Sequence, residues 1–319
     1  LAAMLLTQAC AHNFSVPPES PQHVYAVEGE DQTLPRRWAP LFAAHGFEET
    51  YNRIGRPVTC GGAEARDEDC VRIDTSRPTV YVMQRAFATE RGIYTNLIYR
   101  VHFPRVPYSL VPFHLTAGRN VGLLVVITLD GRGRPVLVTT VHTCGCYLAI
   151  VPTNFLDPSA YPEHWREEPL SVYGETLPPR LDFGAVASPG LLVHLRPGVH
   201  RVMDLAVVPA RSTGEAPYEP IPMQMADMGD LEHLPAPAGP VSFYYEAGVR
   251  KGYVKGAFKP LETLMLGLIS LDFFVGTDKV YGDPAIWDNP FYTSLKPWRR
   301  RDSDMWHFAD FLHYWGWRL

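Results

Sequence analysis

The sequence predicts an α+β fold with a predominantly antiparallel β core, long proline-rich loops and C-terminal helices. Three observations lead to this prediction. Apolar and β-branched runs of strand length recur between residues 79 and 208, with polar turns between them. The chain has 30 prolines among 319 residues, about twice the usual share, so long helices do not dominate. Helix-like patterning is strongest after residue 260.

The clearest local pattern is that of a β-hairpin. Residues 121–129 form a near-continuous apolar run, residues 135–142 form a second one, and a Gly-rich polar turn separates them. Two such runs are typical of paired antiparallel strands. The other expected elements, in chain order, are an extended leader over 12–35, a short helix over 36–47, strands over 93–103 and 146–151, a hairpin over 191–195 and 199–208, a strand over 241–247, a mostly buried helix over 261–274 and a final helix over 304–315.

The two late helices carry recognisable end signals. Pro260 suits the first turn of one helix, and Asp302 or Ser303 can cap the other. The chain has no internal repeat and no sharp change of composition. We therefore expect residues 12–319 to form one β-rich globular domain, with its helices over about 260–319.

The first eleven residues, 1–11, are expected to be a signal-peptide remnant or a lipoprotein anchor. An apolar run ends there in small residues around Cys10, as at a signal cleavage site. Cleavage after Ala11 and lipidation of Cys10 are the two alternatives, and a frayed helix of a cytosolic protein is a third. The pattern favours an exported bacterial envelope protein, in the periplasm or on the outer cell surface, lipid-anchored if Cys10 is modified.

Charge and hydropathy restrict the partners. A formal net charge of −5 argues against a nucleic-acid binder, which normally carries a basic excess. The longest apolar stretch, residues 261–275, is too short for a transmembrane span and contains two acidic residues. The aromatic C-terminal helix follows a basic run at 298–301, which suits an envelope protein partner or a membrane surface. Its apolar spacing favours docking on the protein's own core.

Cys60 and Cys70 bound a polar loop and are predicted to form a disulfide. Four cysteines remain if the first eleven residues are removed, and an even number suits an oxidising compartment. The alternative is a cation site made by the acidic residues 64–69. That segment lacks the alternating ligand spacing of a calcium loop.

The first candidate for chemistry is the segment containing His142, Cys144 and Cys146. Alternate side chains of an extended strand point to one face, so an imidazole and two sulfurs would lie together. Thiolates with an imidazole suit copper(I) or zinc. A Cys-x-Cys pair can also exchange between dithiol and disulfide, and a single cysteine beside histidine can be a nucleophile. The alternative is a structural pair, oxidised or simply buried.

The second candidate is a cluster of methionines at Met223, Met225 and Met228. It resembles the methionine motifs of periplasmic copper-handling proteins, because thioethers are soft ligands. The resemblance places copper(I) ahead of zinc as the metal. His102 and His114 are further residues that could complete such a site. A flexible apolar loop against the core is the alternative for the methionines.

These features support three functional hypotheses. The leading one is an exported envelope protein that binds a soft metal through His142, Cys144 and Cys146. The second is a non-enzymatic structural or assembly protein of the envelope with disulfide-bonded cysteines. The third is a thiol oxidoreductase, or a hydrolase without a recognisable motif, since the sequence contains no standard hydrolase, zincin or nucleotide-binding motif. No residue receives a catalytic role from the sequence.

Overall fold

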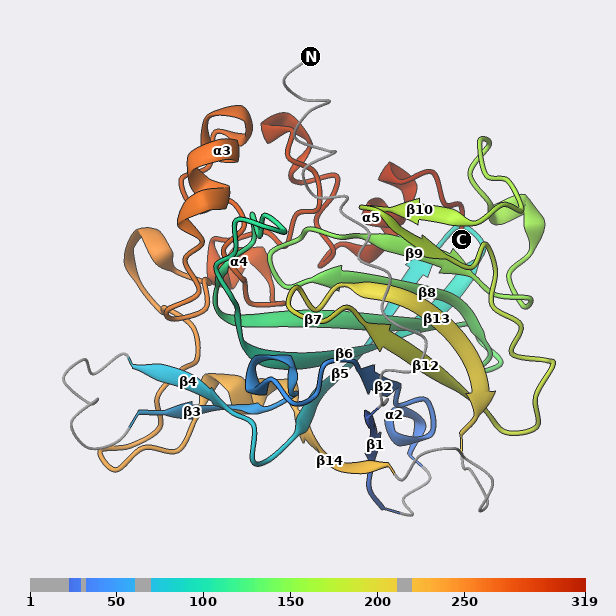
Figure 1. Ribbon diagram of the computed structural model, residues 1–319. Coiled ribbons are helices and arrows are strands. Elements are labelled where there is room, and N and C mark those ends of the chain that lie inside the picture. Colours follow the sequence, from blue (N-terminus) through green and yellow to red (C-terminus); the bar gives the residue numbers. More distant parts are fainter. Residues whose placement is uncertain (1–22, 30–32, 61–69, 211–219) are drawn as a thin grey trace.

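A ten-stranded sheet dominates the computed structural model, which describes residues 23–29, 33–60, 70–210 and 220–319 (Figure 1). The strand order is β13-β12-β2-β1-β14-β5-β6-β7-β8-β9, and two small two-stranded sheets, β10-β11 and β3-β4, accompany it. The strands are β1 His23–Val27, β2 Leu41–Ala44, β3 Arg56–Thr59, β4 Val71–Asp74, β5 Thr79–Thr89, β6 Gly92–Val106, β7 Gly118–Leu129, β8 Pro135–His142, β9 Ala149–Pro152, β10 Leu170–Val172, β11 Glu175–Leu177, β12 Pro189–Leu195, β13 Val202–Pro209 and β14 Ile221–Asp227.

The large sheet is mixed, so the predominantly antiparallel core expected from the sequence is found only in part. Strands β5 to β9 form the antiparallel meander that the sequence predicts. Strand β14, however, lies parallel to both β1 and β5, and β12 lies parallel to β2. These parallel pairs join segments far apart in the chain, so no local turn signal announces them.

Both predicted hairpins are confirmed. In the first, β7 pairs with β8 from Leu123↔His142 to Leu129↔Pro135. In the second, β12 pairs with β13, and the loop between them spans residues 196–201, longer than the expected turn. His194 therefore faces Asp204 across the ladder, while His200 lies in the loop.

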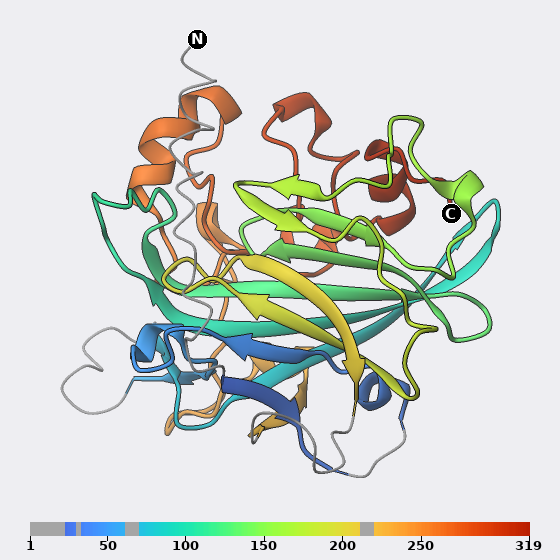
Figure 2. The same ribbon diagram turned by 45° about the vertical axis from the view of Figure 1, so that its right-hand side comes forward.

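The apolar run over 121–129 reflects burial of both faces of the sheet. Val121, Leu123, Val125 and Ile127 contribute to one core, and Leu124 and Val126 to another. The first core lies inside the curl of the sheet, where β12 and β13 fold over β7 and β8 (Figure 2). The second core lies between the other face and the C-terminal segments.

Helices are few and short. They are α2 Leu34–Arg37, α3 Pro260–Ser270, α4 Pro284–Trp287 and α5 Phe308–Tyr314, with 3-10 turns at Thr50–Asn52, Pro158–Ala160, Met228–Glu232, Gly248–Arg250 and Pro297–Arg299. The helix expected over 36–47 is wrong, because α2 ends at Arg37 and β2 occupies the middle of that segment. The strand expected over 241–247 is reduced to isolated bridges at Val241 and Tyr244. No helix in the described residues has the length and apolar character needed to cross a membrane.

Both late helices differ from expectation, α3 in its exposure and α5 in its length. Helix α3 was expected to be mostly buried, yet Leu264 and Leu268 are 78% and 82% exposed. The final helix begins only at Phe308, after a turn in which Asp304 accepts hydrogen bonds from backbone amides. Its apolar stripe packs into the second core, as its spacing predicts, with Phe308 and Leu312 buried.

Candidate functional site

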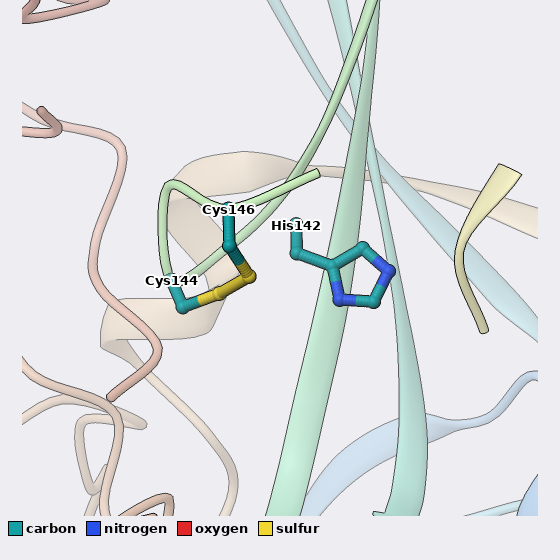
Figure 3. A group of neighbouring side chains, drawn as sticks. All are labelled: His142, Cys144 and Cys146. Carbon is teal, nitrogen blue, oxygen red and sulfur yellow. A yellow bond between two sulfur atoms is a disulfide. The ribbon is translucent and has the colours of Figure 1, made fainter. Parts of the chain in front are cut away.

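The candidate site is the turn over residues 143–148, which connects β8 to β9. The expected strand over 146–151 begins only at Ala149, so the side chains are not brought together by strand alternation. A tight turn does so instead: the Gly145 amide donates to the His142 carbonyl at 2.8 Å, and the His142 amide donates to the Cys146 carbonyl at 2.9 Å. Cys144 and Cys146 form a disulfide beside the His142 ring (Figure 3). One nitrogen and two sulfurs lie within 4.8 Å of one another.

Gly145 is required for this turn. Its φ of +91° lies in a region that side chains rarely adopt, and a Cβ there would stand 2.1 Å from the backbone oxygen of Tyr292. The C-terminal segment therefore packs directly against the disulfide loop. The Thr143 amide also donates to the Gly122 carbonyl of β7 at 2.9 Å, which ties the start of the turn to the sheet.

A group of buried charges contacts the turn. Asp278 is fully buried, accepts a hydrogen bond from the Thr143 hydroxyl and lies 2.9 Å from the ammonium of Lys259, which is also fully buried. Lys279, again fully buried, donates from Nζ to the Cys144 carbonyl at 2.8 Å and lies 4.1 Å from the ring centre of Tyr292. Burial lowers the pKa of Lys279 to about 8, although the neighbouring carboxylates oppose the shift. No sequence motif indicates this group, and the one signal for it is the pair of adjacent charges at 278–279 after an apolar segment.

The histidines near the turn are held neutral by burial. Burial, with the charge of Lys259, lowers the pKa of His142 to about 3, and burial beside His142 lowers the pKa of His200 to about 3. A hydrogen bond to the backbone of His200 orients the His142 ring. Its Nε2 is buried and makes no hydrogen bond to any described residue, so it is free to act as a ligand or acceptor.

The disulfide forms part of the wall of a cavity of about 300 Å³. Cys144 is only 4% exposed, and Cys146 is the more exposed of the pair. The remaining lining is mostly apolar and aromatic and comes from α3, the segment after it and two loops: Leu115, Thr116, Gly145, Tyr147, Tyr173, Glu262, Leu266, Ile269, Val275, Gly276, Tyr292, Thr293 and Leu295. One acidic side chain of this lining, Glu262, comes from α3. Burial raises its pKa, and its Oε2 has no hydrogen-bond partner in the part of the chain that the structure describes.

The methionines do not join this site. Met223 is buried in the first core, and Met228 in the second. Met223 and Met225 lie on β14, which β5, β6 and β7 separate from β8 in the sheet order, and Met228 begins the 3-10 turn after β14. No methionine lines the cavity among the described residues. Met225 packs at the edge of the first core and completes the cluster.

The other two histidines named from the sequence also lie outside the turn. His102 is fully buried on β6, where it accepts a hydrogen bond from Arg100 Nε at 2.9 Å. A ring nitrogen of His114 is 2.8 Å from the Pro107 carbonyl. Both make contacts typical of structural histidines, and neither belongs to the His142–Cys144–Cys146 group.

The disulfide predicted between Cys60 and Cys70 is confirmed, with a Cα–Cα distance of 5.4 Å. It closes the end of the β3–β4 ladder, where the Cys60 amide donates to the Cys70 carbonyl at 3.0 Å. The acidic residues 64–69, weighed as a cation site, lie outside the described residues, as does Cys10. Comparison of the chain with family models, with curated proteins and with solved structures finds no match.

Proposed function

We propose that the chain is an exported envelope protein that carries out thiol–disulfide exchange through Cys144 and Cys146. The observation that carries the proposal is a disulfide between cysteines two residues apart in the wall of a cavity, with one sulfur-bearing residue buried and the other partly exposed. A second disulfide at Cys60–Cys70 supports an oxidising compartment, because such bonds are rare where thiols are kept reduced.

The exchange would begin at Cys146, the more exposed residue. A substrate thiolate attacks Sγ of Cys146, the Cys144–Cys146 bond breaks, and its electron pair leaves on Sγ of Cys144 as a thiolate. A second substrate thiolate then attacks the substrate sulfur of this mixed disulfide. The substrate becomes a disulfide, Cys146 leaves as a thiolate, and two electrons have passed to the protein. The two protons lost by the substrate thiols go to solvent or to the protein thiolates.

The surroundings of Cys144 suit a leaving thiolate. The ammonium of Lys279 is held 2.8 Å from the carbonyl oxygen of Cys144, and a nearby cation favours the thiolate over the thiol. The hydrogen bond from the Thr143 hydroxyl to Asp278 keeps the start of the turn in place when the disulfide opens. The cavity beside Cys146 leaves room for a substrate sulfur.

The test is a single-turnover exchange with the oxidised full chain. One equivalent of a peptide dithiol should be oxidised per chain, and mass mapping should find the two new thiols at Cys144 and Cys146. Cys146→Ser should abolish the reaction, whereas the double variant Cys60→Ser, Cys70→Ser serves as the matched control and should retain it. If dithiothreitol fails to open Cys144–Cys146 in the folded protein, the proposal is wrong.

A second candidate function is soft-metal binding by the reduced form. The observation in its favour is the 4.8 Å grouping of His142 with both cysteines, since two thiolates and an imidazole suit copper(I) or zinc. Reduced protein should bind one ion per chain in competition with a chelator, and His142→Ala should weaken binding at least tenfold. Met223→Leu, a change of similar volume in the core, should leave the affinity unchanged. Reduced protein that binds neither metal would refute this function.

A further inference from the structure

Two hollows meet at the disulfide turn. The first is the cavity of about 300 Å³ beside α3, and the second is a groove of about 890 Å³ beside β10. Gly145, Tyr173 and Thr293 line both, so the two hollows adjoin across the turn that carries the disulfide. Figures 1 and 2 show α3 and the β10–β11 hairpin on the same side of the large sheet. A ligand that spans both hollows passes Gly145, the residue between Cys144 and Cys146.

The α3 side offers apolar surface. Glu262, Leu266 and Ile269 recur at helical spacing and line the cavity together. Ile269 is also 59% exposed, and the neighbouring Leu268 is 82% exposed on the outer face. The apolar lining therefore continues from the cavity onto the surface of the molecule. An exposed apolar surface of this kind commonly marks a site for a protein partner.

The β10 side offers a strand edge. Strand β10 pairs with β11 through Leu170, Ser171 and Val172, and those three residues line the groove. No other described strand pairs with β10. An unpaired edge can accept an extended peptide as an additional strand. Trp165 and Trp315, which also line this groove, provide aromatic surface for its side chains.

Glu262 adds a polar feature that a peptide can satisfy. Its side chain is 4% exposed, its Oε2 is unpartnered among the described residues, and it lines the cavity. A backbone N–H of a bound peptide is a suitable donor for this oxygen. The described lining of the α3 cavity contains no lysine or arginine, so a small thiol that carries carboxylates finds no counter-charge there.

We propose that the substrate is an extended polypeptide segment in which an apolar side chain lies next to a cysteine. The segment runs along β10, its cysteine reaches Cys146, and the apolar side chain enters the cavity beside α3. This inference rests on the thiol exchange proposed above and identifies its substrate class. A small thiol would use one hollow only and would gain nothing from α3 or β10.

The test compares three thiols in reduction of the oxidised full chain: a blocked peptide with leucine and phenylalanine beside its cysteine, the same peptide with serine and glutamate there, and glutathione. The apolar peptide should react at least about tenfold faster than the other two, because burying one large apolar side chain corresponds to that factor or more. Methylation of alternate backbone nitrogens should slow the apolar peptide, since strand pairing requires the N–H groups.

Two surface variants of α3 make the test specific. Ile269→Ser, at the rim of the cavity, should reduce the preference for the apolar peptide about tenfold. Leu264→Ser is the matched control: Leu264 is 78% exposed on the same helix and does not line the cavity, so the preference should remain. Equal rates for the three thiols, with Cys144–Cys146 still opened by dithiothreitol, would overturn the substrate assignment alone. A disulfide that no thiol opens would overturn the exchange itself.

Discussion

Replacement of Asp278 by asparagine should destabilise the protein strongly, because it leaves a buried cation without its partner. Asp278 and Lys259 are both fully buried, and their charged atoms are 2.9 Å apart. Their contact is a charge pair rather than a well-aligned hydrogen bond, since neither atom has a hydrogen-bond partner in the described chain. Asp278 also accepts from the Gly122 amide at 3.1 Å and from the Thr143 hydroxyl.

The expected loss in the free energy of unfolding is about 3–5 kcal/mol, the range found when one partner of a buried ion pair is removed. A separate argument limits the upper end of this range of free-energy loss. An ordinary lysine can give up its proton at pH 7 at a cost of about 4.6 kcal/mol, so a buried ammonium does not cost much more than that. The asparagine side chain can still accept from Gly122 or Thr143, which keeps the loss from exceeding this range.

Urea unfolding of the oxidised protein, followed by circular dichroism, measures this loss at pH 7. The matched control is Asp288→Asn, which breaks an ion pair of similar length, 2.8 Å to Lys251, at a site where the aspartate is 70% exposed. An exposed pair contributes about 1 kcal/mol or less. If Asp278→Asn costs no more than Asp288→Asn, the buried charge pair does not stabilise the protein.

Three further predictions concern a buried carboxylate, the disulfide turn and the Cys60–Cys70 bond. Burial alone would raise the pKa of Glu175, but hydrogen bonds from Arg196 and Arg201 outweigh burial and hold that pKa below its usual 4.5. The ionised Glu175 therefore stabilises the folded protein fully above pH 4.5, and this stabilisation is lost as the pH falls through the lower pKa of the folded state. Glu175→Gln should cost about 3–5 kcal/mol at pH 7 and less at pH 3, and a difference in urea unfolding that does not change with pH would contradict this. Gly145→Ala should displace the disulfide turn, and it should either slow reduction of the disulfide by dithiothreitol or destabilise the fold by more than about 1 kcal/mol. Gly131→Ala is the control and should do neither, because an added Cβ there has its nearest neighbour at 3.9 Å. Loss of the Cys60–Cys70 bond in the double serine variant should lower the free energy of unfolding by about 3 kcal/mol, from the entropy of a ten-residue loop, and an unchanged midpoint would exclude that contribution.

The parts of the fold that the sequence predicted are those governed by local patterns. The run over 121–129 is apolar because both faces of β7 are buried, and the polar turn after it specifies the partner strand. The disulfide at Cys60–Cys70 was predictable for a similar reason, since the two residues lie close in sequence at the end of one ladder. By contrast, β14 reaches its place between β1 and β5 through pairings with distant segments, and nothing within residues 221–227 encodes them.

The candidate site shows the same division. The sequence identified His142, Cys144 and Cys146 by their spacing, and the structure groups them, but by a turn and not by a strand. That turn depends on Gly145, where the carbonyl oxygen of Tyr292, 147 residues later, leaves no room for a side chain. The exposed face of α3 was also unpredictable from its composition, because an apolar helix is equally compatible with burial in a core and with a binding surface.

The C-terminal segment therefore decides what the cysteine pair can do. It provides the cation at Lys279 beside Cys144, the carboxylate at Asp278 that anchors Thr143, and the wall of the cavity through α3. A Cys-x-Cys turn without these contacts would be an ordinary surface disulfide. The buried charges contact Thr143 and the Cys144 carbonyl, whereas Ile269 lines the cavity, so electrostatic support and substrate contact involve different residues. Variants of Asp278 should consequently change stability, whereas variants of Ile269 should change substrate preference, and the two effects should be additive.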